Sequence, residues 1–443
     1  MDINTKISNK KIGVISLGCD KNRVDTEKML FILKDVHTLV SDLEQAEIVI
    51  INTCAFLQNS REEAFSEILS VAELKEYGKL EKIIVTGCLP QKFIGEIFDE
   101  LVEADAFLGV SDYGEILNVI DRIYSGERIN AVGEPRGECG TKRVLTTDNY
   151  AYLKIADGCS NHCTYCLIPM IRGKYRSVPK NELVEEAKAL GDVKELILVA
   201  QDTAKYGLDL QPQSSLPELI RAISALSNIH SIRLLYCYPE NITDELIHEF
   251  NANAKLVRYI DIPFQHADDK ILKLMNRKGT GEGYLALVKR LKEQVKGIAI
   301  RSTFITGFPT ETESEFNNLV EFIKQAKLFN AGFFKYSREE GTPAYKLPCQ
   351  VLAKEKTKRH KKLYSVQKKV VKETSKGLIG KTFKVLAEGF DENEFIYYGR
   401  AYFNAPDIDG KIYFFSKEEV EYGKYYDVRL TKATGYDLYG ERL

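Results

Sequence analysis

The sequence has no long apolar segment and almost no net charge. No run of apolar residues approaches the ~18 that a membrane-spanning helix needs. With 62 Lys and Arg against 64 Asp and Glu, the formal net charge is -2, which argues against a protein whose whole surface coats nucleic acid or anionic lipid. The first residues, MDINTKISNKK, contain no apolar core of a secretion signal, so we expect a cytoplasmic protein. Apolar residues make up 44% of the 443 residues, which excludes wholesale disorder and predicts about three folded domains.

Cysteine is the residue type whose use is unusual. The chain has nine cysteines, an odd number, without an export signal. Thiols stay reduced in a cytosol, so these cysteines indicate metal binding or catalysis rather than disulfides.

The first part of the chain alternates short apolar runs with amphipathic stretches. Two helical stretches, 25–34 and 60–76, separate runs that we interpret as buried strands. Those runs are KIGVISL (11–17), EIVIIN (47–52), KIIVTG (82–87) and ADAFLG (104–109). This alternation predicts an α/β domain over residues 11–130, an open parallel sheet with helices on both faces. The stretch 133–143, rich in Gly and charged residues, is typical of a linker.

The middle part repeats the alternation six times. Helical stretches such as 181–190 and 311–326 separate the expected strands. The strands are AYLKIAD (151–157), ELILVAQD (195–202), SIRLLYC (231–237), YIDIPFQ (259–265), GIAIRSTFITG (297–307) and GFFKYS (332–337). Six units rather than eight predict a partial (β/α)6 barrel over residues 145–375, with its chemistry at the C-terminal ends of the strands.

A basic stretch, 354–376, closes the middle part. It carries ten Lys or Arg against two Glu, with apolar residues at near-helical spacing. One interpretation is a linking helix with a solvated face. The other is a patch that contacts RNA phosphates.

The C-terminal part, 377–443, changes character again. Runs rich in Tyr, Phe and Val are separated by PDIDG and EEVEYG, which predicts a small antiparallel β-barrel. Nine Lys and Arg against twelve Asp and Glu give this part a net charge of -3.

Three cysteines of the middle part share one short loop. Cys159, Cys163 and Cys166 lie in DGCSNHCTYCLIP, directly after the first strand. Three such thiolates can bind three corners of a [4Fe-4S] cluster and leave the fourth iron open for a small molecule. The alternative is structural zinc, which usually has four protein ligands. His162 is the nearby fourth candidate, but it is adjacent to Cys163 and could reach the same metal only with strain.

This loop resembles that of the radical S-adenosylmethionine (SAM) superfamily, in which C-x3-C-x-aromatic-C binds a cluster whose open iron chelates SAM. Tyr165 occupies the aromatic position. The resemblance implies reductive cleavage of SAM to a 5′-deoxyadenosyl radical, which abstracts a hydrogen from an unactivated carbon. Such chemistry requires an electron donor and leaves the protein to supply binding and orientation.

A second trio is spread over the first domain. Cys19, Cys54 and Cys88 each follow an expected strand. The C-terminal ends of parallel strands share one edge of the sheet, so these thiols should meet there. Buried cysteines are also common as small apolar residues. Three at equivalent turns nevertheless indicate a second [4Fe-4S] site with one open iron.

Two such sites in consecutive domains resemble the methylthiotransferases, which have a three-cysteine domain, a radical SAM barrel and a C-terminal TRAM domain (here 377–443). The resemblance covers essentially the whole chain. It implies that one SAM supplies a methyl group and a second supplies the radical. The N-terminal cluster would hold or deliver sulfur, so that a methylthio group replaces a hydrogen.

Two branches of that family are candidates. One modifies adenosine in tRNA, and the other modifies the β-carbon of an aspartate in ribosomal protein S twelve. Four runs resemble the protein-modifying branch: SLGCDKNRVDTE (16–27), YIDIPFQHADDKILKLMNR (259–277), YSREEGTPA (336–344) and GRAYFNAPDIDGKIYF (399–414). A barrel that holds tRNA should be basic, whereas a net charge of -3 suits a basic ribosomal protein. We therefore favour the protein substrate, with tRNA as the alternative.

Several polar residues at the expected rim of the barrel are candidate contacts for SAM or for the substrate. They are Tyr165, Gln201, Arg301, Ser302 and Gly307, with Asp202, Gln265, His266 and Thr303 as neighbours. The turn 307–312 leads into a helix whose N-terminal N–H groups could hold a polar group.

Two arginines and three cysteines complete the candidates. Arg172 and Arg176 follow the cluster loop and could face a carboxylate. Cys139, Cys237 and Cys349 have no partner at ligand spacing and are interpreted as linker or core residues. A non-catalytic, zinc-stabilised adaptor for the ribosome is the remaining alternative, but two three-thiolate sites would make poor structural zinc sites.

Overall fold

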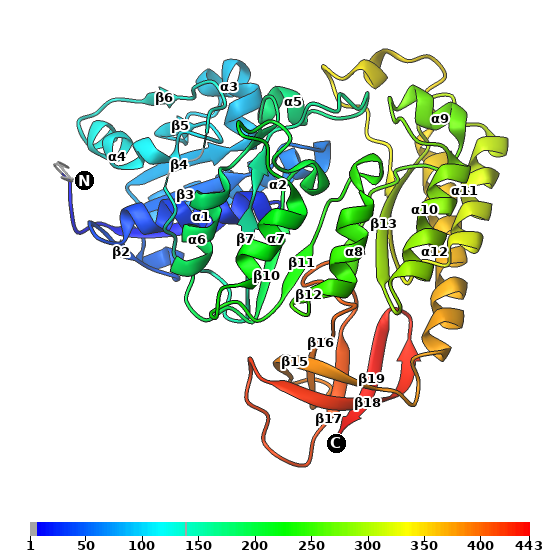
Figure 1. The fold of residues 1–443 in the computed structure, drawn as a ribbon. Coiled ribbons are helices and arrows are strands. Elements are labelled where there is room, and N and C mark those ends of the chain that lie inside the picture. The colour runs from blue at the N-terminus through cyan, green and yellow to red at the C-terminus, as the bar shows by residue number, and fades with distance from the viewer. Residues whose placement is uncertain (1–6, 138–139) are drawn as a thin grey trace.

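The computed structural model describes residues 7–137 and 140–443, which form two parallel sheets and a small closed barrel (Figure 1). Cys139 lies outside the described residues. Within the described part of the chain, no helix is both long enough and apolar enough to cross a membrane.

The N-terminal domain is an open sheet of six parallel strands in the order β2-β1-β3-β4-β5-β6. Its elements are β1 (Lys11–Ser16), α1 (Asp20–Leu33), β2 (Thr38–Leu39), β3 (Ile48–Thr53), α2 (Gln58–Tyr77), β4 (Lys82–Gly87), α3 (Cys88–Glu100), β5 (Ala106–Leu108), α4 (Ile116–Tyr124) and β6 (Ile129–Ala131). Along β3, Val49 and Ile51 pack on the side of α2 and α3, while Ile48 and Ile50 pack on the side of α1 and α4. The predicted sheet with helices on both faces is confirmed.

Helix α1 begins at Asp20, five residues before the predicted start. The prediction missed this turn because the buried face of α1 is polar, and an apolar periodicity does not reveal it. Two of its buried charged residues pair with the middle domain, Asp25 with Lys154 and Lys28 with Glu186, and Glu27 pairs with Arg143 at the end of the linker. The helix therefore joins the first two domains through ion pairs.

The middle domain is an open sheet of six parallel strands in the order β14-β13-β12-β11-β10-β7, as a partial barrel requires. Its strands are β7 (Tyr150–Lys154), β10 (Glu195–Val199), β11 (Ile232–Leu234), β12 (Leu256–Asp261), β13 (Ala299–Thr306) and β14 (Asn330–Lys335), beside a short ribbon of β8 (Ala156–Asp157) and β9 (Arg176–Ser177). Its helices are α5 (Ile168–Ile171), α6 (Lys180–Ala189), α7 (Leu216–Ser224), α8 (Asp244–Ala252), α9 (Asp269–Leu274), α10 (Gly281–Gln294), α11 (Glu313–Ala326) and α12 (Ala353–Lys376). Several strands end three or four residues earlier than predicted, because buried residues continue into the loops that follow them.

The C-terminal domain is a closed barrel of five strands in the order β15-β16-β17-β19-β18. The strands are β15 (Thr382–Asp391), β16 (Ile396–Arg400), β17 (Ile412–Phe415), β18 (Tyr425–Thr434) and β19 (Asp437–Arg442). Four strand pairs are antiparallel, but β17 and β19 run parallel, so the predicted antiparallel pattern is wrong for that pair. The barrel closes there by joining two strands that are not consecutive.

The barrel lies below the middle sheet, where the strands begin (Figure 1). Its contacts reach the starts of three strands: Arg400 bonds Glu195 (2.6 Å), the Tyr402 carbonyl accepts from Arg233 (2.8 Å), and the Phe403 carbonyl accepts from Asn330 (3.1 Å). The opposite end of the sheet, where the strands finish, is left for the functional loops.

Candidate functional site

The three N-terminal cysteines lie at the C-terminal ends of three neighbouring strands. Cys19 follows β1, Cys54 follows β3, and Cys88 is the first residue of α3 directly after β4. A β-carbon added to Gly18 (φ +88°) would lie 2.6 Å from the β-carbon of Cys54, so only glycine allows the loops of Cys19 and Cys54 to approach this closely. Burial raises the pKa of the Cys88 thiol to about 12, and both other thiols contribute to that rise. The structure therefore brings this trio together.

One side chain, Asn22, contacts all three of these cysteine turns. Its amide nitrogen donates to the carbonyl oxygens of Leu17 (3.1 Å) and Thr53 (3.0 Å), next to the loops of Cys19 and Cys54. Its Oδ1 lies 3.8 Å from the sulfur of Cys88. Asn22 is fully buried in the first turn of α1, so it acts as a spacer among the three loops.

The second trio lies on the loop between β8 and α5, at the C-terminal end of the first strand of the middle sheet. Thr164 anchors this loop, since its N–H and its hydroxyl donate to the carbonyl oxygens of Met275 (3.1 Å) and Leu274 (2.7 Å). Burial raises the pKa of Cys159 to about 11 and raises that of Cys166 further. All three thiols therefore sit on a loop that the neighbouring loops of the sheet hold in place.

Cys163 has a polar partner outside its own loop. The hydroxyl of Tyr238 lies 3.0 Å from its sulfur, and the guanidinium of Arg277 stacks over the Tyr238 ring at 3.7 Å. His162, next in the chain, is exposed with a left-handed φ of +52°, and its carbonyl accepts from Asn276. The sequence pointed to neither Tyr238 nor Arg277, because they lie 75 residues or more beyond the loop that they contact.

Arg172 lies between the two trios. Its guanidinium donates to Asp157 Oδ2 (2.9 Å), two residues before Cys159, and to Asn22 Oδ1 (2.7 Å). It also pairs with Asp25 at 3.0 Å. The sequence predicted a carboxylate partner for Arg172, and the structure supplies two from the chain itself.

Arg176 faces no carboxylate among residues 7–137 and 140–443, so the chain itself does not supply the predicted partner. Its guanidinium donates to the backbone carbonyls of Lys174, Arg136 and Arg172. These bonds fix the return of the chain behind the cluster loop.

Comparison with known proteins identifies the family. Three family models match consecutive segments: "Uncharacterized protein family UPF0004" at residues 11–109, "Radical SAM superfamily" at 153–323 and "TRAM domain" at 379–443. The protein named ribosomal protein uS12 methylthiotransferase RimO from Lachnoclostridium phytofermentans is 45% identical over 97% of this chain and 99% of its own length. Its namesake from Clostridium kluyveri is 46% identical over 97% of each chain. The chain belongs to the RimO family.

Solved structures of radical SAM enzymes share the fold of this RimO-family chain. The methyltransferase TsrM from Kitasatospora setae aligns with a TM-score of 0.56 and 14% identity over 76% of this chain and 77% of its own. The cobalamin-dependent radical enzyme OxsB aligns with a TM-score of 0.51 and 13% identity over 83% of this chain and 61% of its own. At this identity the comparison concerns the fold alone.

The residues predicted to contact SAM in this RimO-family chain do not all lie in the same surroundings. Tyr165 packs beside Met275 and Phe308 next to the cluster loop. Gln201 donates to Asp157 Oδ1 (3.0 Å), while its own Oε1 is buried without a hydrogen-bond partner among the described residues. The neighbouring Asp202 is held by two asparagine side chains and is a structural residue.

Arg301 and Ser302 point to opposite faces of β13. Arg301 pairs with Asp261 (2.9 Å) and with Asp409 of the barrel (3.4 Å). Ser302 is fully buried, and its hydroxyl accepts from the N–H of Phe264 (3.3 Å). Since neighbouring side chains of a strand alternate, Arg301 and Ser302 cannot both contact one ligand.

The turn at residues 307–312 uses its own N–H groups. Gly307 donates to the Glu311 carboxylate (2.9 Å), and Thr312 donates to Glu315 (2.8 Å). His266 is fully buried, with its Nε2 3.3 Å from Glu311 and its Nδ1 accepting from a backbone N–H, which makes it a structural histidine. Those N–H groups are therefore satisfied within the chain.

The remaining cysteines of the described structure lie apart from the two trios. Cys237 is fully buried in the core of the middle domain, and Cys349 is exposed.

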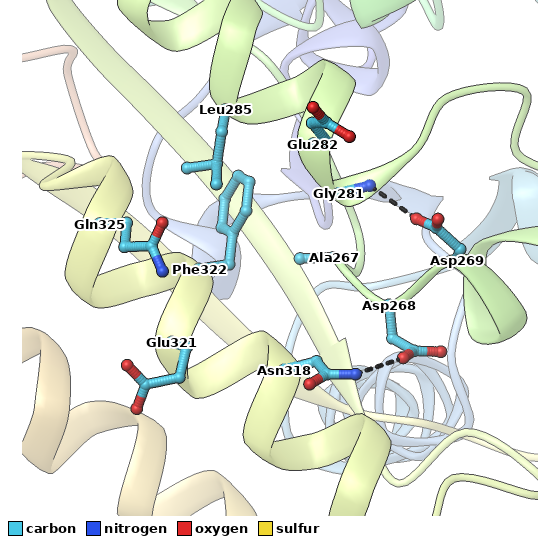
Figure 2. A pocket seen from close by; sticks show the side chains of 10 residues that line it. All are labelled: Ala267, Asp268, Asp269, Gly281, Glu282, Leu285, Asn318, Glu321, Phe322 and Gln325. Atoms are coloured by element: carbon cyan, nitrogen blue, oxygen red, sulfur yellow. Dashed lines mark hydrogen bonds between the residues drawn. The ribbon is translucent and has the colours of Figure 1, made fainter.

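A hollow on the outer side of the middle domain lies between α9, α10 and α11 (Figure 2). Two of its acidic side chains have partners in its wall: Asn318 donates to Asp268 (2.7 Å), and the N–H of Gly281 donates to Asp269 (2.8 Å). The residues that line it include none of the predicted site residues. We therefore place the functional site at the cysteine trios.

Proposed function

We propose that this chain replaces a hydrogen on the β-carbon of an aspartate in ribosomal protein uS12 with a methylthio group, by radical SAM chemistry. The observation that carries the proposal is the pair of cysteine trios at the ends of two packed sheets, in a chain 45% identical to a RimO protein over 97% of its length. The alternative, a tRNA adenosine substrate, is not favoured because these relatives are named for a ribosomal protein.

The two trios fit iron–sulfur clusters. Cys159, Cys163 and Cys166 would hold the cluster that binds SAM, and the N-terminal trio would hold a second. Among residues 7–137 and 140–443, no three His, Cys, Asp or Glu side chains converge closely enough for a single metal ion. A four-iron cube binds each thiolate at a different iron, so its ligands lie further apart than those of a zinc ion.

The clusters and SAM, when bound, supply the radical and the sulfur, and the residues of this chain orient them. The Tyr238 hydroxyl lies 3.0 Å from the Cys163 sulfur and would donate to it once that thiol has lost its proton, and Asn22 sets the spacing of the N-terminal trio. Arg172 places a positive charge between the two sites. Ligand thiols must lose their protons to bind iron, so the raised pKa values of Cys88 and Cys159 make cluster assembly release protons.

The SAM contacts form a second part of the proposal. The sequence predicts five such residues, Tyr165, Gln201, Arg301, Ser302 and Gly307, and we propose that SAM is bound by residues from this set. Gln201 has the best support, because its buried Oε1 has no partner in the described structure and Gln201 lies beside Asp157 in the approach to the cluster loop. The alternation along β13 means that only one of Arg301 and Ser302 fills such a role.

Partners, location and boundaries follow from the same proposal. We propose that the exposed lysines of α12 contact ribosomal RNA on the small subunit and that an electron donor reduces the SAM cluster. We propose a cytoplasmic enzyme, because its substrate is a ribosomal protein. Its domains span 11–130, 145–375 and 377–443.

The decisive experiment compares substrates. The anaerobically reconstituted protein is incubated with SAM and reductant, together with either uS12 or tRNA, and the products are weighed by mass spectrometry. We expect uS12 to gain the mass of a methylthio group less one hydrogen, at an aspartate. A modified tRNA with unchanged uS12 would contradict the assignment.

Iron analysis tests the two clusters separately. We expect about eight iron per chain in the parent protein and about four in Cys54→Ala or in Cys163→Ala. Cys54→Ala should still cleave SAM but not transfer a methylthio group, whereas Cys163→Ala should do neither. Cys237→Ala, which removes a buried cysteine outside both trios, is the matched control and should keep about eight.

A further inference from the structure

Arg172 is one of the largest fully buried side chains of the molecule, at 1% exposure. It follows the loop of Cys159, Cys163 and Cys166 at the end of α5. A buried guanidinium is costly unless its hydrogen bonds and charge are satisfied, so its position requires an explanation. Its contacts run to both domains, next to both cysteine trios.

We propose that Arg172 is a positioning residue whose guanidinium, fixed between the two cysteine trios, raises the reduction potential of an iron–sulfur cluster on Cys19, Cys54 and Cys88. The inference rests on the proposed function, because it requires a cluster at that trio.

The first support is geometric. Arg172 donates to Asn22 Oδ1 at 2.7 Å, and Asn22 is the side chain that contacts all three turns of the N-terminal trio. The other terminal nitrogen of Arg172, Nη1, donates to Asp157 Oδ2 at 2.9 Å, at the entry to the second cysteine loop. The planar fork of arginine reaches both domains at once, which a lysine ammonium cannot do in the same geometry.

The second support is electrostatic. The guanidinium of Arg172 is buried, and only the side-chain oxygen of Asn22, 2.7 Å from the guanidinium and 3.8 Å from the sulfur of Cys88, lies between that charge and the trio. The field of Arg172 therefore favours negative charge on sulfur in the N-terminal trio. A cluster gains negative charge when it is reduced, so the same field favours its reduced state.

The local charges nearly cancel, which makes a single substitution informative. Lys154 and Arg172 carry two positive charges, and Asp25 and Asp157 carry two negative charges, all of them buried. Removing Arg172 leaves one net negative charge beside the trio, and removing Asp25 leaves one net positive charge. The two changes should move the reduction potential in opposite directions.

The experiment uses the full chain with Cys159, Cys163 and Cys166 replaced by alanine, so that only the N-terminal trio can bind a cluster. After anaerobic reconstitution, the midpoint potential is measured by redox titration with electron paramagnetic resonance. For Arg172→Gln we expect the equilibrium constant of reduction to fall about tenfold, which is a decrease of about 59 mV for a one-electron couple. Arg172→Lys should lie between Arg172→Gln and the parent.

Asp25→Asn provides the test of sign and keeps the inference falsifiable if Arg172→Gln does not fold. It nearly preserves the shape of the side chain, and we expect its midpoint potential to rise. Arg233→Gln is the matched control, since Arg233 is equally buried and ion-paired but lies at the barrel end of the sheet. Its midpoint should equal that of the parent.

The outcomes separate the two proposals. Equal midpoints in the parent, Arg172→Gln and Asp25→Asn, at equal iron content, would overturn the role of Arg172 and leave the proposed function intact. A parent protein that binds no iron at the remaining trio would overturn the two-cluster function itself.

Discussion

The hydroxyl of Tyr238 and the sulfur of Cys163 lie 3.0 Å apart, although 75 residues separate them in the chain. Tyr238 follows β11, and Cys163 lies on the loop after β8, so the two loops meet at the end of the middle sheet. Arg277 covers the tyrosine ring and limits its rotation. A hydrogen bond to a ligand sulfur is one way in which a protein sets the potential of a cluster.

Tyr238→Phe should lower the reduction potential of the cluster on Cys159, Cys163 and Cys166, because the hydrogen bond stabilises the more negative, reduced state. Iron content should not change, since every ligand thiol remains. Redox titration by electron paramagnetic resonance gives the midpoint. Tyr206→Phe is the control, because the Tyr206 hydroxyl bonds the Val178 carbonyl instead. If the midpoint potential of Tyr238→Phe equals that of the parent, the hydrogen bond to Cys163 does not set the potential of this cluster.

Asn22→Ala should empty the N-terminal site and spare the other. The change leaves the carbonyls of Leu17 and Thr53 without this donor and Arg172 without this acceptor, at a cost of about 1–3 kcal/mol in unfolding free energy. Iron should fall from about eight toward about four per chain while SAM cleavage remains. Asn318→Ala, which removes a surface amide beside Asp268, should retain both clusters. Full iron loading of Asn22→Ala would show that the trio needs no spacer.

Glu195 makes the stability of the molecule depend on pH at the junction with the C-terminal barrel. Burial alone would raise its pKa, but Arg233 and Arg400 bring the pKa below the ordinary 4.5. The unfolded chain then binds the proton more readily than the folded one. The stabilisation is therefore complete above a pH of about 4.5 and is lost as the pH falls through the lowered folded value.

Glu195→Gln should destabilise the protein by about 3–5 kcal/mol at neutral pH, because it leaves two buried arginines without their shared carboxylate. The acid limb of the stability curve should also become flatter. Urea unfolding at a series of pH values, followed by tyrosine fluorescence, measures both. Glu218→Gln, at an exposed carboxylate, should change neither. If the unfolding free energy of Glu195→Gln falls with decreasing pH as steeply as that of the parent, the pH dependence belongs to other groups.

Helix α12 presents its lysines on one side and its apolar residues on the other. Replacing Lys361, Lys362, Lys368 and Lys369 with glutamine should weaken binding to small ribosomal subunits at low salt. The slope of log affinity against log salt should become shallower by about 0.7 to 0.9 for each phosphate that a lysine no longer neutralises. Glutamine at Lys289 and Lys324, two exposed lysines elsewhere, is the control. Equal salt slopes would favour the simpler interpretation, a solvated linking helix.

The sequence allowed both trios to be located because the approximate positions of the strands follow from the local apolar pattern. Cys19, Cys54 and Cys88 each come directly after an apolar run, and parallel strands finish at one edge. The exact strand ends could not be predicted, since Asp202 and Cys237 continue a buried run after the backbone has left the sheet. The opposite orientations of Arg301 and Ser302 could have been predicted from the sequence, because neighbouring side chains of a strand point to opposite faces of the sheet.

The partners of Arg172 and Tyr238 could not be predicted. Arg172 meets Asn22 across 150 residues, and no local period encodes a contact of that range. One signal was present in AYLKIAD, where Lys154 stands among the apolar residues of an expected strand. A charge at a fully buried position must have a counter-charge, and here that group is Asp25.

The polar inner side of α1 has a consequence for assembly. An apolar patch tolerates small rotations, but Asp25, Glu27 and Lys28 each have a specific partner of opposite sign, and any other docking angle would strand charges away from water. The pairing of opposite charges therefore fixes how the first two domains dock. The ion pairs of α1 consequently hold the two groups of thiols at one separation.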